Sequence, residues 1–154
     1  MRREGEARAG LPRQPVGAGY KHDQDVWFLV DALVDYRCDY HGGDPLRWSG
    51  EAVELFLLHH VPRQLSADTV ALARAPEVLR AWIPWAARRA GLPDGSEGGA
   101  LGWIDEMEEE YRRAIVDEGR WSPAKQMVMA MMAAGVDPSD DDEVDRWLAS
   151  RVGV

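Results

Sequence analysis

Apolar residues recur along most of this chain at steps of three and four, the spacing that places them on one face of an α-helix. Residues 25–38 show the pattern clearly, with a stripe made of Val26, Leu29, Val30, Leu33 and Val34. Comparable stripes occur in residues 100–117 and after residue 122. The pattern predicts an all-α fold: a single-domain bundle of about six to seven helices within residues 22–154.

Residues 47–93 carry the densest apolar signal in the chain. Ser49 suits the N-cap of a helix, because its hydroxyl oxygen can accept a hydrogen bond from a free N–H of the first turn. Pro62 predicts a break in that helix, since proline lacks the N–H that an interior helical bond needs. A second long helix is expected to begin at Pro76 and to end at Gly91, which readily adopts a left-handed C-cap conformation. We expect the other helices to cover this stretch.

The C-terminal part contains a methionine-rich helix. Ser122 suits its N-cap and Pro123 its first position. Most of the helix circumference is then covered by Met127, Val128, Met129, Met131 and Met132. We expect this helix to belong to the core, but if it is exposed it is the leading candidate for a partner surface. A short final helix is expected after Ser139, docked by Val144, Trp147 and Leu148.

Two segments of the chain repeat loosely. Residues 47–50 read Arg-Trp-Ser-Gly and residues 120–123 read Arg-Trp-Ser-Pro, and each segment precedes a strongly apolar helix. Residues 77–82, Glu-Val-Leu-Arg-Ala-Trp, also correspond to residues 143–147, Glu-Val-Asp-Arg-Trp. Two copies are too few for a solenoid. The alternative within the all-α class is therefore a bundle made of two loosely repeated helix units.

Charge is unevenly distributed along the chain. The 154 residues carry a net charge of −9 at pH 7. The first 21 residues hold five Lys and Arg against two Glu, a net +3, which leaves −12 for the remainder. Because these 21 residues contain almost no large apolar side chains, we expect a disordered basic leader at residues 1–21. A remainder this acidic repels phosphate backbones, which disfavours nucleic acid as a partner.

The apolar and cysteine content bears on the compartment. No apolar run approaches the roughly 20 residues that a membrane span needs, and no secretory signal is evident. We therefore expect no membrane partner. The single cysteine, Cys38, excludes an internal disulfide and is typical of a reducing compartment. These features favour a cytoplasmic location.

One acidic helix face offers the best case for a metal site. Asp31, Asp35 and Asp39 recur every four residues, and His41 follows them. Carboxylate and imidazole groups suit several divalent metals. Aspartates at this spacing more often form a solvated face, and the sequence has no Glu-x-x-His motif. A metal-binding helical bundle, or a metal-dependent enzyme that uses this face, is therefore the alternative hypothesis. Apart from this alternative, we expect no cofactor.

The sequence contains no motif that names a reaction: no Gly-rich phosphate loop, no Gly-x-Ser-x-Gly elbow and no His-Glu-x-x-His. Catalytic groups converge in space rather than in sequence, so whether the protein is an enzyme stays open. The first hypothesis is a non-catalytic protein-interaction or regulatory module with a protein partner, its oligomeric state undetermined. The candidate binding residues, charged groups beside large aromatics, are Arg47, Trp48, Glu54, Arg63 and Trp82. Glu54 lies in an apolar run, so we expect Arg47 or Arg63 to pair with it.

Several segments also carry a resemblance to known proteins. They are Pro-Leu-Arg-Trp-Ser at 45–49, Val-Glu-Leu-Phe-Leu-Leu at 53–58, Pro-Arg at 62–63, Pro-Glu-Val-Leu-Arg-Ala-Trp at 76–82 and Arg-Arg-Ala-Gly-Leu-Pro at 88–93. Together they resemble a group of uncharacterised helical proteins and domains of high-GC actinobacteria, over residues 25–150. No activity, cofactor or catalytic residue is established for that group. The resemblance therefore implies an all-helical cytosolic domain of unknown function.

Overall fold

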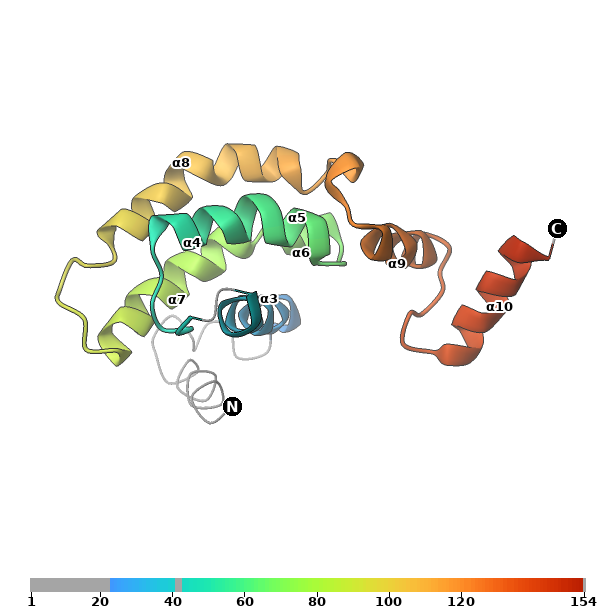
Figure 1. The fold of residues 1–154 in the computed structure, drawn as a ribbon, viewed down its shortest axis with the longest axis horizontal. Coiled ribbons are helices and arrows are strands. Elements are labelled where there is room, and N and C mark those ends of the chain that lie inside the picture. The colour runs from blue at the N-terminus through green and yellow to red at the C-terminus, as the bar shows by residue number, and fades with distance from the viewer. Residues whose placement is uncertain (1–22, 41–42, 154) are drawn as a thin grey trace.

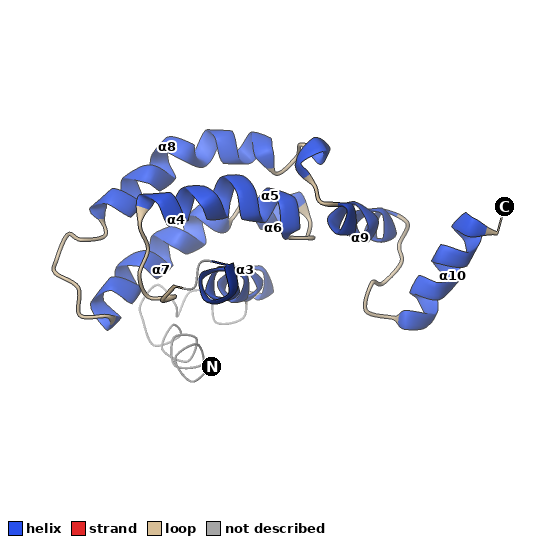
Figure 2. Cartoon of the chain, viewed as in Figure 1, coloured by secondary structure: helices blue, strands red, loops and turns tan. Residues whose placement is uncertain are grey.

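The computed structural model of the chain describes residues 23–40 and 43–153. These residues are 73% helical and include no strand, which confirms the all-α class (Figure 1, Figure 2). The predicted basic leader at residues 1–21 and the candidate ligand His41 lie outside the described residues. Across the described ranges, no helix has the length and apolar character needed to cross a bilayer.

Helix α3 (Gln24–Asp35) begins at Asp23, whose carboxylate accepts a hydrogen bond from the Val26 N–H at 3.2 Å. The same carboxylate forms an ion pair with Arg74 at 2.6 Å, and this hydrogen bond holds the pKa of Asp23 below its usual range. A π-helical turn, η2 (Tyr36–Tyr40), follows α3. The predicted stripe is the buried face of α3, formed by Val26, Leu29, Val30, Leu33 and Val34.

Three segments continue into one another as a single rod: α4 (Gly50–Glu54), the π-helical η3 (Leu55–His60) and α5 (Val61–Gln64). Ser49 caps the start as predicted, because its hydroxyl accepts a hydrogen bond from the Ala52 N–H at 3.1 Å. In Figure 1 the rod runs through the middle of the bundle, with α8 along one side. The stretch with the densest apolar signal thus supplies the central element of the fold.

The break that the sequence predicts at Pro62 is wrong. Hydrogen bonds in a π-helix span five residues, and the N–H of Val61 accordingly bonds to the carbonyl of Phe56. Pro62 then falls in the first turn of α5, where the missing N–H of a proline costs little. The Leu58 carbonyl, four residues earlier, accepts a hydrogen bond from the Arg120 guanidinium at 3.4 Å. The helix therefore continues to Gln64.

The short helix α6 (Thr69–Leu72) leads into the long helix α7 (Ala75–Arg89). Pro76 lies in the first turn of α7 as predicted, and the helix runs through Pro84 without interruption. Gly91 ends it with a φ of 72°, which residues with a Cβ rarely adopt. The N–H of Gly91 donates to the carbonyl of Arg88 at 3.1 Å, and the N–H of Leu92 donates to the carbonyl of Ala87 at 2.9 Å. This pair of hydrogen bonds is a Schellman motif.

Helix α8 (Gly98–Ala114) packs against α4 and α7. Its buried face has the helical spacing that residues 100–117 predict and consists of Ala100, Ile104, Met107, Tyr111 and Ala114, while Leu101 is only half-buried. The backbone of α4 approaches α8 so closely that a Cβ added at Gly50 would lie 1.9 Å from the indole of Trp103. Only glycine fits at the start of α4 with Trp103 in this position.

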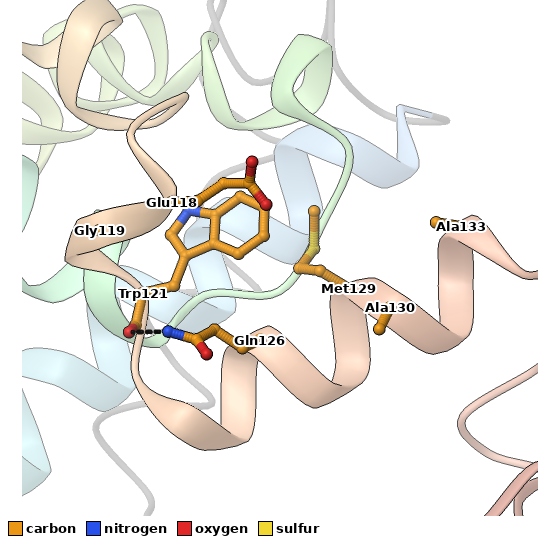
Figure 3. Close-up of a pocket in the computed structure, with 7 residues that line it drawn as sticks. All are labelled: Glu118, Gly119, Trp121, Gln126, Met129, Ala130 and Ala133. Atoms are coloured by element: carbon orange, nitrogen blue, oxygen red, sulfur yellow. Dashed lines mark hydrogen bonds between the residues drawn. The ribbon is translucent and has the colours of Figure 1, made fainter. Parts of the chain in front are cut away.

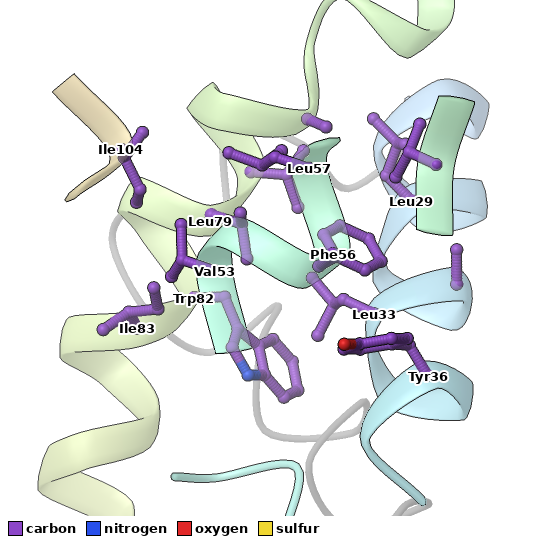
Figure 4. Close-up of a cluster of buried hydrophobic side chains, with 14 of the residues drawn as sticks. Leu29, Leu33, Tyr36, Val53, Phe56, Leu57, Leu79, Trp82, Ile83 and Ile104 are labelled. Atoms are coloured by element: carbon purple, nitrogen blue, oxygen red, sulfur yellow. The ribbon is translucent and has the colours of Figure 1, made fainter. Parts of the chain in front are cut away.

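The core lies where α3, the central rod, α7 and α8 meet. Figure 4 shows Leu33 of α3 and Tyr36 of η2 near Phe56 of the rod, with Trp82 of α7 beside them. Trp82 is completely buried, and Leu79 one turn earlier is equally covered. Large apolar side chains from elements far apart in the sequence thus share one interior.

The last part of the chain is arranged differently. A 3-10 turn, η4 (Glu118–Arg120), is followed by α9 (Pro123–Ala133) and α10 (Asp141–Val152). Figure 1 shows both helices extending away from the other helices, with α10 farthest out. We refer to residues 118–152 as the arm, and to the described residues from 23 to 117 as the body.

Candidate interaction surface

The structure brings two of the five candidate binding residues together. The indole N–H groups of Trp48 and Trp82 both donate to the carbonyl of Pro45, at 3.0 and 2.9 Å. Trp82 is buried and Trp48 is half-buried, so these hydrogen bonds fasten the segment before α4 to α7. The two tryptophans therefore have a structural task, which leaves little of their surface for a ligand.

The three charged candidates do not join them. Arg47 is exposed and forms an ion pair with Asp44 at 3.6 Å. The prediction that Glu54 pairs with Arg47 or Arg63 is wrong: Glu54 is half-buried and has no hydrogen bond or ion pair with any described residue. Arg63 is exposed near the end of α5. A carboxylate at the side of a rod that is covered on only part of its circumference can reach water instead of a cation.

The acidic face of α3 keeps its predicted exposure. Asp31, Asp35 and Asp39 are all exposed. Within residues 23–40 and 43–153, no three His, Cys, Asp or Glu side chains are grouped closely enough to hold a metal ion. His41, the fourth predicted ligand, lies outside the described residues.

An aromatic cluster joins the two π-helical turns. The ring of Tyr36 lies 5.3 Å from Phe56 and 4.8 Å from His60, between ring centroids. The guanidinium of Arg37 lies over the ring of Trp48 at 5.6 Å. Burial lowers the pKa of His60 to about 4, so this imidazole is neutral at pH 7. The cluster is closely packed and belongs to the core.

Lys125 fastens the arm to the body. Its side chain is 1% exposed, and its Nζ donates to the carbonyls of Pro62 at 2.9 Å and Val61 at 3.4 Å. The last carbonyls of a helix lack helical partners and carry the negative end of its dipole, so the end of α5 favours a cation. The Ser122 N–H completes the attachment by donating to the carbonyl of Arg63 at 3.0 Å. Burial lowers the pKa of Lys125 to about 8.

Sequence reasoning missed this attachment. Lys125 lies in the first turn of α9, where a cation is unfavourable with respect to the dipole of its own helix. A lone lysine at that position, before a run of apolar residues, was the available signal. Its partner carbonyls lie more than 60 positions earlier, and backbone carbonyls leave no trace in a sequence.

The apolar side chains of the arm are incompletely covered. In α9 only Lys125 and Met131 are buried, and α10 buries no described side chain. Met127 and Met132 are 49% and 40% exposed. The expectation that the methionine-rich helix is core is therefore wrong, and the alternative applies: α9 is exposed and is the leading candidate for a partner surface. The residues predicted to dock α10 are only half-buried; they are Val144, Trp147 and Leu148.

A groove of about 650 Å³ lies along α9 (Figure 3). Its lining residues are Glu118, Gly119, Trp121, Gln126, Met129, Ala130 and Ala133. The four from α9 recur at i, i+3, i+4 and i+7, which is one continuous stripe of a helix. Gln126 donates from its side chain to the Trp121 carbonyl at 3.2 Å, as the dashed line in Figure 3 marks. The groove is thus mainly apolar, with a carboxylate at one edge.

The start of α10 is strongly acidic. Residues 137–145 hold six Asp and Glu and no Lys or Arg. Asp140 caps the helix by accepting from the Glu143 N–H at 3.2 Å, and Glu143 accepts from the Asp137 N–H at 2.8 Å. The other three, at positions 141, 142 and 145, are exposed and form no side-chain hydrogen bond or ion pair with any residue in the described ranges. The arm therefore combines an apolar stripe with an excess of negative charge, because Arg146 and Arg151 offset only part of the acids on α10.

The arm and the body thus differ in what their apolar surfaces contact, and the geometry points to the arm as the candidate site. Comparison of the chain with models of known protein families, with curated proteins and with solved structures finds no match, so the site must be interpreted from its own chemistry.

Proposed function

We propose that this protein is a non-catalytic protein-interaction or regulatory module, located in the cytosol, whose partner surface is formed by α9 and α10. The observation that carries this proposal is the incomplete burial of both helices, although each bears apolar residues at helical spacing. An amphipathic helix gains most of its stability from an apolar face that packs against something. In the described residues of the arm, that covering surface is largely missing.

The chemistry of the arm supports a protein partner over a small molecule. Small-molecule sites are concave and enclose most of their ligand, with a few polar groups that converge on it. The groove on α9 is open along its length and presents mostly methionine, alanine and tryptophan. Exposed methionines adapt to the shape of an apolar partner surface. The resemblance to helical actinobacterial proteins supplies no activity that would favour a different function.

Site-specific photo-crosslinking in living cells tests the proposal. A photoreactive phenylalanine analogue replaces Met127 or Met132 on the arm, and in a matched control it replaces Val70, which is 73% exposed on the body. We expect both arm positions to give an adduct with the same protein. The control position should give none, because its surroundings are not a partner surface.

Two results would contradict the proposal. Adducts that form equally well at Val70 would indicate random collisions with the whole surface. An absence of adducts at both arm positions, with the full chain present in the cell at normal abundance, would remove the arm as a partner surface. The identity of the captured protein is a separate result.

A further inference from the structure

We propose that the groove on α9 binds a basic amphipathic helix of another protein, a helix of about three turns with Lys or Arg beside its apolar face. This inference rests on the proposed function and specifies the chemistry of the partner. Three observations carry it: the helical stripe that lines the groove, the small residues within that stripe, and the negative charge on α10.

The shape of the groove favours a helix as its occupant. The four lining residues of α9 extend from Gln126 to Ala133, seven positions that correspond to about 10 Å of helix at 1.5 Å per residue. The lining residues Glu118, Gly119 and Trp121 lengthen the groove beyond the start of α9. Helices pack when the ridges of one enter the grooves that the i, i+3 and i+4 rows of the other form. Ala130 and Ala133 permit a close approach, and Met129 beside them can adjust to a side chain of the partner.

The charge of the arm favours a basic occupant. Glu118 lies at one edge of the groove, and the exposed carboxylates of Asp141, Asp142 and Asp145 lie on the next helix. The arm holds seven Asp and Glu against four Lys and Arg, a net charge of −3. Lys125 is buried against α5, so the bases that the arm exposes are Arg120, Arg146 and Arg151, and the acids outnumber them. Lys and Arg next to the apolar face of a partner would meet these carboxylates and speed association. The same charge repels nucleic acid and anionic lipid.

A second copy of the chain is a weaker candidate for the groove. Two arms would bring two sets of acidic residues 137–145 together, and like charges across an interface are unfavourable. A partner with opposite charge avoids this repulsion. Sedimentation of the purified full chain should therefore give a monomer.

Peptide binding to the full chain tests the inference directly. The probe is a labelled 18-residue amphipathic peptide with leucines on one face and Lys and Arg on the flanks, and fluorescence anisotropy measures its affinity. Two matched peptides keep the leucine content: one replaces every Lys and Arg with Glu, and one has the basic sequence scrambled so that no apolar face forms. We expect the basic amphipathic peptide to bind at least tenfold more tightly than either, with an affinity that falls as salt rises.

Variants of the protein locate the binding. Ala133→Tyr fills the groove without a change of charge and should weaken binding at least tenfold, whereas Ala73→Tyr, at an exposed alanine of the body, should leave it unchanged. Asp141→Asn, Asp142→Asn and Asp145→Asn together should weaken binding several-fold and reduce its salt dependence. A control that neutralises Asp94, Glu106 and Glu110, three exposed acids of the body, should not alter the affinity.

The outcomes separate this inference from the proposed function. If crosslinks form on the arm but the acidic or scrambled peptide binds as well as the basic one, the inference is overturned and the interaction module remains. If Ala133→Tyr has no effect, the groove is not the site and the inference is again overturned. A dimer that Ala133→Tyr dissociates would identify a second copy of the chain as the occupant. Displacement of the probe by a synthetic peptide of residues 1–21 would identify the chain's own basic leader as the occupant. Either result overturns the inference. An absence of arm crosslinks removes the proposed function instead.

Discussion

Two segments of this chain begin with nearly the same residues and end in opposite environments. Arg-Trp-Ser at 47–49 opens the central rod, and Arg-Trp-Ser at 120–122 opens α9. Both serines cap their helices with a hydrogen bond of 3.1 Å to an N–H three residues later. Phe56, in the seventh helical position of the rod, is 1% exposed, whereas Met129, in the same position of α9, is only half-buried. A shared helix start therefore does not decide whether the helix is covered.

The second half of the repeat shows why the environments differ. Leu79 of α7 is fully buried, and Asp145 occupies the corresponding position of α10. Trp82 packs in the core, but Trp147 is half-buried with the Arg151 guanidinium 4.7 Å above its ring. An aspartate in place of leucine cannot be buried without a partner. The two segments thus share local signals, but α10 has an aspartate where α7 has a buried leucine, which narrows the apolar face of α10.

The two corresponding tryptophans give the sharpest contrast and the largest expected effect. Trp82→Ala should lower the free energy of unfolding by about 3–5 kcal/mol, because it empties a fully buried site. Trp147→Ala should lower it by no more than about 1 kcal/mol, which is the contribution of a cation–π contact near the surface. Urea unfolding followed by circular dichroism measures both. Equal effects would mean that Trp147 is as well packed in the arm as Trp82 is in the body, and would contradict the difference in burial between them.

Acid should destabilise the body through His60. The pKa of this side chain is about 4 in the fold and 6.5 ordinarily. Between these values the unfolded chain binds a proton that the folded chain does not, so stability falls as the pH falls from 6.5 to 4 and this contribution is constant at higher pH. His60 is half-buried and solvent screens part of this effect, so His60→Phe should remove about 1–2 kcal/mol of that loss.

Unfolding free energies of both proteins at pH 7 and pH 4 measure the difference. The arm is identical in the two proteins, so its own response to acid cancels in this comparison. A variant that loses the same stability as the original chain between these pH values would show that His60 titrates normally and is not desolvated by Tyr36 and Phe56.

The start of the central rod should tolerate only glycine. Gly50→Ala should cost about 1–3 kcal/mol, since its Cβ would overlap the Trp103 indole and displace it. Gly99→Ala is the matched control: it lies in the first turn of α8 with open space around it, and should stabilise the protein by about 0.4–1 kcal/mol. Thermal unfolding distinguishes the two signs. A neutral Gly50→Ala would mean that α4 and α8 are not in close contact.

The smallest effects concern the two serine caps. Ser49→Ala and Ser122→Ala should each remove about 1 kcal/mol from the helix they cap. The Ser49 variant should lower global stability, because the rod unfolds with the body. The Ser122 variant should instead increase hydrogen exchange in residues 123–133 with little change in global unfolding. Loss of global stability in both variants to the same degree would show that the arm unfolds together with the body.

The sequence by itself determined the helices. The caps at Ser49 and Ser122, the left-handed glycine at Gly91 and the apolar stripes of α3 and α8 are where the residues predict them. These signals act between residues at most about four positions apart, so a single chain displays them completely. The predicted break at Pro62 is wrong because the hydrogen bonds of a π-helical turn span five residues instead of four just before the proline.

Only the tertiary structure decided which apolar helices are covered and which are exposed. Trp82 bonds to a carbonyl 37 positions away, Tyr111 to one 39 positions away and Lys125 to one 63 positions away. Of the candidate site residues, Trp48 and Trp82 share hydrogen bonds to one carbonyl, and the three charged residues lie apart from them. The methionine-rich helix, which the sequence predicts to be core, is exposed. Burial depends on what lies opposite a helix face, and periodicity describes the face alone.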